Sequence, residues 1–317
     1  MITSIANYDD APRRGSVAEP LDLTVLIVND FAGKEKNWRD EVRAVNAFLR
    51  QDVGRTFRIV IAESEDFRDA PVPNALTSLS DKIEIAYFNE TRSAQLKDAG
   101  VGAVKTEWVL VIDADCEPNA GFVRNLIAAV EKYPDFDYFI SRAHYGLNTP
   151  LRRAASMFDR HRDNECEDRR VYYVPGHGFL ARTNVAKRFR APNAPTPFLA
   201  TPVRQSRILS GGAKVRFVGD AVADHEFSLG FIWDFNRELG FASYLSRRES
   251  HGHSALRVLG SLQKAMFKTF ASRHRDFLRW TDYPIALALQ VFAIAPMLYG
   301  IWEAASGRIE NRRSHFR

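Results

Sequence analysis

Runs of aliphatic and aromatic residues alternate with amphipathic stretches through the first two thirds of the chain. The runs predict buried strands, which we expect at 23–29, 57–62, 83–88, 108–112, 137–141, 171–174, 215–218 and 221–223. Apolar residues at helical spacing predict helices at 37–51, at 92–104 and from Phe122 to Val130. Strands that alternate with helices in this way indicate an α/β fold, in which helices flank a mostly parallel sheet.

Individual residues refine the helices in this pattern. The buried face of the 37–51 helix should hold four apolar residues, namely Val42, Val45, Phe48 and Leu49. We expect the 92–104 helix to be interrupted near Gly100 and Gly102. The segment 191–202 contains four prolines, so it cannot form one helix as a whole.

After residue 227 the pattern becomes helical, with helices expected at 228–248 and 254–279. Residues 283–302 then carry no charge, and the segment is about as long as the roughly 20 residues that span a bilayer. Pro296 and Gln290 are unusual in such a span. Three arrangements therefore fit this segment: a span, a helix lying in the lipid surface, or a buried core helix.

The chain is expected to divide into three parts. Residues 1–21 are polar and lack an apolar signal core, which predicts a disordered leader and an active domain in the cytosol. Residues 22–227 would form the α/β domain. Residues 228–317 would form a basic and apolar helical extension that associates with a membrane.

The charge is mildly basic and unevenly placed, with a net charge of +5 that is concentrated after residue 240. Such a region favours an anionic partner, a membrane surface or phosphate groups. No nucleic-acid-binding motif accompanies the charge, so nucleic acid is not expected as a partner. The two cysteines, Cys116 and Cys166, form neither a disulfide framework nor a metal-binding Cys spacing, which favours a reducing compartment.

The strongest chemical signal follows the 108–112 strand, where the chain reads Asp113-Ala114-Asp115. Alternation along an extended chain points both carboxylates to the same side, at the strand end where α/β sheets bind ligands. Two such carboxylates repel each other unless a cation compensates them, and oxygen ligands suit Mg²⁺ or Mn²⁺. The pattern thus favours a divalent cation that holds a diphosphate, although a solvated turn or a helix cap uses the same residues.

Four blocks of sequence, residues 23–29, 92–118, 175–182 and 212–226, carry a resemblance to a known family. In order and spacing they resemble the family 2 glycosyltransferases, which have the GT-A fold. The most specific block runs from Arg92 through Lys97 and the buried strand to the Asp-x-Asp sequence and Pro118. The resemblance implies a nucleotide-sugar-binding catalytic domain over 22–227. Such an enzyme moves a sugar from a nucleotide-diphosphate donor to a glycan or lipid-linked acceptor, with inversion and with Mn²⁺ or Mg²⁺.

The resemblance also implies roles for residues that match the family's blocks. Asp115 would bind the metal, Asp113 would face the ribose and the metal, and His225 would be a further metal ligand or a diphosphate contact. Without the resemblance, His225 could equally be a structural histidine beside the sheet. The remaining nucleotide-sugar contacts would be Asn29, Glu63 and Glu65 at strand ends, Lys97 near the phosphates, and His177, which lines the acceptor site or fits a tight turn.

One departure from the family concerns the general base. The family usually has a Glu-Asp pair at the start of the helix before Gly212, where this chain has Ala200 and Thr201. An inverting displacement needs a base within hydrogen-bond reach of the acceptor hydroxyl. The candidates are Asp224 and the acidic residues of an expected exposed loop, which are Asp163, Glu165, Glu167 and Asp168. A second departure is Asp98, where the family commonly has Asn.

Two other functions fit parts of the sequence. The missing base favours a non-catalytic nucleotide-sugar-binding or scaffold protein in polysaccharide assembly. A nucleotidyltransferase would also place acidic residues and a metal on an α/β sheet, but Gly33 and Lys34 are only a faint trace of its phosphate loop. For the transferase we expect a cytoplasmic protein, peripheral or anchored at the cytoplasmic face of the inner or plasma membrane.

Overall fold

A computed structural model describes residues 21–29, 38–51, 53, 57–79, 81–90, 92–160, 174–176, 178–194, 196–251 and 254–307. The predicted leader, apart from its last residue, lies outside this range. Most of the predicted 171–174 strand does so as well. Only Val174 of that strand is described, and it is not in a strand.

The core of the molecule is a single eight-stranded sheet with the strand order β3-β2-β1-β4-β7-β6-β8-β5. The strands are β1 (Leu23–Val28), β2 (Arg58–Ser64), β3 (Ile83–Phe88), β4 (Trp108–Asp113), β5 (Cys116–Pro118), β6 (Tyr138–His144), β7 (Phe179–Arg182) and β8 (Val215–His225). The strands β3, β2, β1 and β4 run parallel, as do β6 and β8. However, β7 is antiparallel to both β4 and β6, and β5 is antiparallel to β8. Four of the seven strand pairs are thus parallel, so the sheet is mostly parallel as expected, with antiparallel pairing at β7 and β5.

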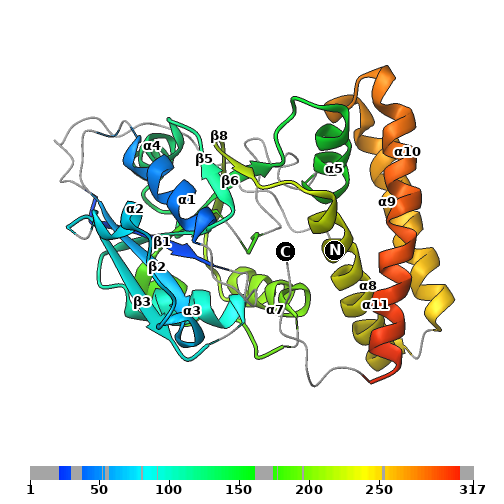
Figure 1. Cartoon of the computed structure of the whole chain (residues 1–317), viewed down its shortest axis with the longest axis horizontal. Helices are drawn as coiled ribbons and strands as arrows, with labels where there is room; N and C mark the ends of the chain where they lie inside the picture. The colour runs from blue at the N-terminus through cyan, green and yellow to red at the C-terminus, as the bar shows by residue number, and fades with distance from the viewer. Residues whose placement is uncertain are drawn as a thin grey trace.

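Helices cover both faces of this sheet (Figure 1). On one face α1 (Arg39–Leu49) and α4 (Phe122–Lys132) pack on a core that includes Ile27, Ile61 and Leu110. On the other face α3 (Ser93–Ala103), α6 (Thr183–Arg188) and α7 (Pro197–Ser210) pack on Leu26, Val109 and other residues. Two short elements, η1 (Glu65–Phe67) and α2 (Asn74–Thr77), connect β2 to β3.

Several expected elements differ from the observed ones. Helix α3 is not interrupted at Gly100 or Gly102. Gly100 allows the helix to pack closely on the sheet, since a Cβ there would press on the side chains of Leu26 and Ala62. The two strands expected at 215–218 and 221–223 are one strand, β8, which tolerates a register shift against β6. The proline-rich segment is not one helix, as expected, because α7 begins within it at Pro197 and then includes Pro202.

The helix faces also differ at two positions of α1. Leu49 is 39% exposed, whereas the charged Glu41 is buried. The buried face of α1 therefore includes Glu41, Val45 and Phe48 but not Leu49, so it differs from the face that hydrophobicity alone predicts.

The C-terminal helices form a second layer beside one end of the sheet, where they pack against α5 (Pro150–Arg160) (Figure 1). They are α8 (Leu229–His251), α9 (Ala255–Phe277), η3 (Trp280–Asp282), α10 (Tyr283–Phe292) and α11 (Ile294–Ala305). Arg153 of α5 forms a buried two-pronged ion pair with Asp282, at 2.8 and 2.9 Å. Among the described residues one helical stretch, Trp280–Ala305, is long and apolar enough to cross a membrane.

Candidate functional site

The acidic sequence lies where β4 ends and the chain turns back. Asp113 is the last residue of β4, Ala114 and Asp115 form a turn, and Cys116 begins β5. The antiparallel pairing of β5 with β8 places Cys116 opposite His225. This pairing brings His225 beside Asp115, as the sequence analysis required for a shared site.

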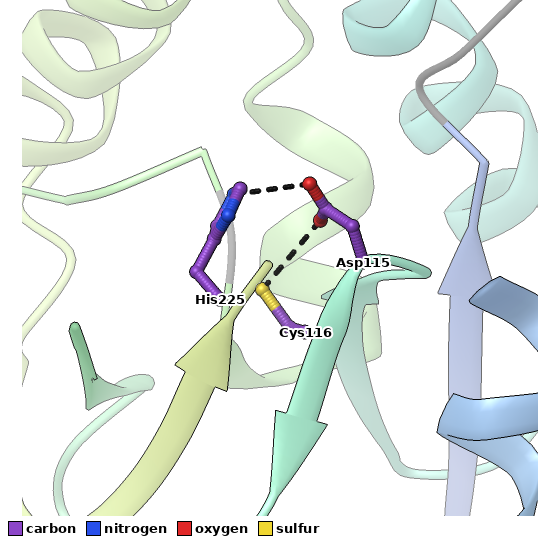
Figure 2. A group of neighbouring side chains, drawn as sticks. All are labelled: Asp115, Cys116 and His225. Carbon is purple, nitrogen blue, oxygen red and sulfur yellow. Dashed lines mark hydrogen bonds and ion pairs between the residues drawn. The ribbon is translucent and has the colours of Figure 1, made fainter. Parts of the chain in front are cut away.

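His225 and Asp115 face each other at this sheet edge. Nε2 of His225 lies 3.2 Å from Oδ2 of Asp115, and Sγ of Cys116 lies 3.8 Å from Oδ1 of the same carboxylate (Figure 2). Nδ1 of His225 lies 3.0 Å from the carbonyl oxygen of Glu226. Because a carbonyl oxygen only accepts, Nδ1 carries a proton, and when the ring is neutral Nε2 turns a lone pair toward Asp115. Such a contact needs either a second ring proton or a cation to be favourable.

The three side chains form a candidate metal centre. Their ligand atoms all lie within 4.8 Å of one another, and all three residues are buried. Histidines that bind metals commonly donate the other ring N–H to a backbone carbonyl, which is how His225 contacts Glu226. A carboxylate, an imidazole and a thiol at this spacing fit a divalent cation.

Arg43 of α1 fixes the turn that carries Asp115. Its Nη2 donates to the carbonyl oxygen of Asp115 and to Oε2 of Glu226, each at 3.2 Å. The backbone N–H of Glu226 donates to the same Asp115 carbonyl at 2.8 Å. Asp40 also pairs with Arg43, at 3.4 Å, and burial together with the nearby Glu226 raises the pKa of Asp40 from 3.8 to about 6.

An aromatic wall supports the ring of His225. Tyr145 meets it edge-on, with centroids 5.6 Å apart, and Phe231 of α8 lies at 5.0 Å. Tyr145 is fully buried, and its hydroxyl donates to Asp159 of α5 at 3.3 Å. The C-terminal helices therefore help to position His225, which a boundary at residue 227 did not suggest.

Asp113 is paired with a cation from the chain itself. Its Oδ1 lies 2.6 Å from Nζ of Lys97 on α3, and both side chains are at most 10% exposed. The structure thus brings together two residues that the sequence analysis assigned to the ribose, metal and phosphates. Those ligand roles remain predictions.

A second buried polar cluster lies at the carboxyl ends of β1 and β2. The side-chain amide of Asn29 donates to Glu41 of α1, and also to Oε2 of Glu63 at 3.5 Å. Glu63 accepts from the backbone N–H of Ser64 at 2.9 Å, and both glutamates are almost fully buried. Glu65 lies outside the cluster, where a hydrogen bond from Arg68 lowers its pKa.

The candidates for a general base are only partly described. Asp224 precedes His225 in β8, so its side chain points to the opposite face of the strand, where Oδ1 lies 2.8 Å from Nδ1 of His144. The other candidates, Asp163, Glu165, Glu167 and Asp168, lie outside the described residues, as does His177.

The family's usual base position is described and holds no carboxylate. Ala200 is buried and Thr201 is half-buried near the start of α7. Asp98, the second departure, accepts from the backbone N–H of Ala191 at 2.6 Å and lies near Arg204. Burial raises the pKa of Asp98 despite the Arg204 charge.

Sequence reasoning missed four residues around the site. Glu41 could have been found, because it lies four residues before Val45 on the buried stripe of α1. Cys116 directly follows Asp115, and its place opposite His225 depends on the β5–β8 pairing. Tyr145 and Phe231 had no local signal, since distant elements bring them to His225.

Comparison with known proteins identifies a family for part of this chain. A sequence model described as glycosyl transferase family 2 matches residues 42–190, which include Asp113 and Asp115 but not His225. No curated protein matches the chain significantly.

Among solved structures, the mannosyltransferase PcManGT from Pyrobaculum calidifontis, in complex with GDP-Man and Mn²⁺, is 12% identical. The match covers 96% of this chain and 91% of that one, with a TM-score of 0.56. S. aureus TarS 1–349 is 14% identical over 92% of this chain and 89% of that one, with a TM-score of 0.46. The likeness to PcManGT shows the GT-A fold. The chain therefore contains a glycosyltransferase family 2 domain, matched over residues 42–190, and has the GT-A fold.

Proposed function

We propose that this protein moves a sugar from a nucleoside-diphosphate donor to a glycan or lipid-linked acceptor, assisted by Mn²⁺ or Mg²⁺. The observation that carries the proposal is the opposed pair of Asp115 and His225 at the carboxyl end of β4. The match of residues 42–190 to the family 2 model supports the sugar transfer. The mannosyltransferase with the same fold, which was solved with GDP-Man and Mn²⁺, supports the class of donor and of metal.

Asp115 and His225 would hold the cation, with Nε2 of His225 oriented by the Glu226 carbonyl. When bound, the cation would act as a Lewis acid that neutralises charge on the departing diphosphate. Asp113 would face the ribose, and Lys97 would add positive charge close to the phosphates. Asn29 and Glu63 would contact the nucleotide at the ends of β1 and β2, with Glu65 nearer the surface.

On the acceptor side, a carboxylate must take the proton of the attacking hydroxyl. Asp224, Asp163 and Glu165 remain the candidates, with His177 proposed to line the acceptor site. We further propose a cytoplasmic location at the inner or plasma membrane, supported by the apolar stretch Trp280–Ala305. That location would bring the enzyme close to a lipid-linked acceptor.

Turnover of UDP- and GDP-sugars with Mn²⁺ or Mg²⁺ tests the proposal, both as transfer and as slow donor hydrolysis. Asp115→Ala should reduce metal-dependent turnover by roughly a hundredfold or more, because several kcal/mol of charge stabilisation depend on the cation. Asp220→Ala is the matched control, since Asp220 is an exposed aspartate of β8. Turnover that is equal in Asp115→Ala and in the wild type would refute the metal-assisted mechanism.

A non-catalytic nucleotide-sugar-binding protein is the second candidate, and the observation that favours it is Ala200 and Thr201 in α7. Thermal unfolding with UDP or GDP separates the two, because a ligand that binds only the folded state raises Tm. A Mn²⁺-dependent rise in Tm without any turnover would support the binding protein instead of the enzyme.

A further inference from the structure

An exposed apolar stripe runs along α10 and α11. Its members are large, carry no charge and are 37–67% exposed, and we call them the exposed apolar face: Leu287, Val291, Phe292, Leu298, Tyr299 and Trp302. With 3.6 residues per turn, these positions fall on one side of two consecutive helices. The chain from 283 to 302 contains no charged residue. A continuous apolar surface of this kind marks an interaction site.

The opposite side of α10 and α11 is packed tightly on the protein. Met297 and Ile301 are buried in a core shared with α8 and α9, and Leu289 is buried in a core shared with α5. A Cβ at Gly240 would overlap the backbone of Met297, and a Cβ at Gly300 would overlap that of Arg237. The two glycines therefore allow α8 and α11 to lie in direct contact. Only one side of the apolar segment is left for a partner.

The packing of α8 decides between a span and a surface helix. Helix α8 lies beside α11, and Arg237 of α8 forms a two-pronged ion pair with Glu303, at 2.6 and 2.8 Å. Helix α8 also carries Asp234, Arg247 and Arg248. If α10 and α11 crossed a bilayer, α8 would take these charges into hydrocarbon, which strongly opposes insertion.

The neighbouring helix α9 carries exposed basic residues. It packs beside α11 and shares a core with it, at the edge of the molecule far from β3 (Figure 1). Lys264, Lys268 and Arg275 are exposed on α9, and Arg279 is exposed just after it. Asp276 is the only acidic residue between 255 and 279. Trp280 of η3, which precedes α10, is 81% exposed. Tryptophan is enriched at the level of the lipid headgroups, so an exposed Trp280 is consistent with contact there.

We propose that the exposed apolar face docks onto an anionic lipid surface, with α10 and α11 lying in the plane of the membrane. The apolar side chains would enter the boundary between headgroups and acyl chains, and the basic residues of α9 would contact anionic headgroups. The charged helix α8 then stays on the water side. This inference concerns the C-terminal helices alone and does not depend on sugar transfer.

Vesicle sedimentation of the full chain tests this docking. Vesicles of phosphatidylcholine alone are compared with an equal mixture of phosphatidylcholine and phosphatidylglycerol. We expect at least about tenfold tighter binding to the mixture, and weaker binding as salt is added. The doubly substituted variant Leu287→Glu/Val291→Glu should lose about tenfold or more in binding, whereas Leu49→Glu, at an exposed leucine of α1, should bind like the wild type.

A second variant tests the role of the basic residues, and an extraction test distinguishes a surface helix from a membrane span. Lys264→Glu/Lys268→Glu should remove the preference for the anionic mixture without preventing folding, because both lysines are exposed. An alkaline carbonate wash should release the protein from the vesicles, and retention in the pellet would overturn the proposal in favour of a span. Absence of vesicle binding would also overturn the proposal. If the wild type then formed a dimer and the Leu287→Glu/Val291→Glu variant did not, a second copy of the chain would be the partner. Donor turnover by this variant in solution should be unchanged, so failure of docking is distinguishable from failure of the enzymatic function.

Discussion

The buried pair of Arg153 and Asp282 offers the sharpest test of how the C-terminal helices are held. Asp282 is fully buried and receives two hydrogen bonds from the Arg153 guanidinium and one from the backbone N–H of Arg279. Arg153→Met removes the two charged donors and leaves the carboxylate buried. Each charge-assisted bond contributes about 1.5–3 kcal/mol, and breaking a buried pair costs about 3–5 kcal/mol. We therefore expect the free energy of unfolding to fall by about 3–5 kcal/mol.

The assay is urea unfolding of four proteins: the wild type, Arg153→Met, Asp282→Leu and the double variant. The double variant should be closer to the wild type than either single variant, because no buried charge is left without its partner. Arg68→Met is the surface control, since the solvent-exposed pair of Arg68 with Glu65 should contribute little to stability. A loss below about 1 kcal/mol in Arg153→Met, or single effects that simply add, would refute the reasoning.

The pH dependence gives an independent check on the same pair. The hydrogen bonds from Arg153 lower the pKa of Asp282 from 3.8 to about 2. Because the folded-state pKa is the lower one, the stabilisation is complete above about pH 4 and is lost as the pH falls toward 2. Asp282→Leu should therefore flatten the stability curve between pH 4 and 2. An unchanged slope in this variant would show that Asp282 does not titrate in this window.

Two further predictions concern Asp40 and the glycines between helices. Burial and Glu226 raise the pKa of Asp40 to about 6, so its ionisation destabilises the folded state as the pH rises from about 4 to 6. After allowance for the partial exposure of Asp40, Asp40→Asn should raise the free energy of unfolding by about 1 kcal/mol at pH 8 and have no effect at pH 3. A gain that is the same at both pH values would contradict this prediction. Gly300→Ala should lower Tm and cost about 1–3 kcal/mol, because a methyl group there overlaps the Arg237 backbone. Gly260→Ala in α9, where nothing lies within 4 Å, should instead stabilise by about 0.5–1 kcal/mol, and equal effects of the two substitutions would refute the packing argument.

Local pattern was enough for most strands and helices. The hydrophobic run of β4 and the Asp-Ala-Asp sequence after it predicted a strand with carboxylates at its end, and the structure places Asp113 there. Glycine and proline were less informative, because their effect depends on neighbours. Gly100 lies within an intact α3 where it lets the helix approach Leu26, and Pro202 is accommodated inside α7.

The sequence by itself determined the α/β class, the strand that carries Asp113, and the apolar length of the 283–302 segment. These depend on residue spacing along a few turns or one strand, which secondary structure converts directly into a buried face. Only the tertiary structure decided that β7 makes the sheet mixed, that His225 meets Asp115, and that Lys97 pairs with Asp113. It also decided that α8 covers one side of α11 and leaves the other open. Those outcomes come from strand pairing and helix packing between distant parts of the chain, and no local period in the sequence encodes them.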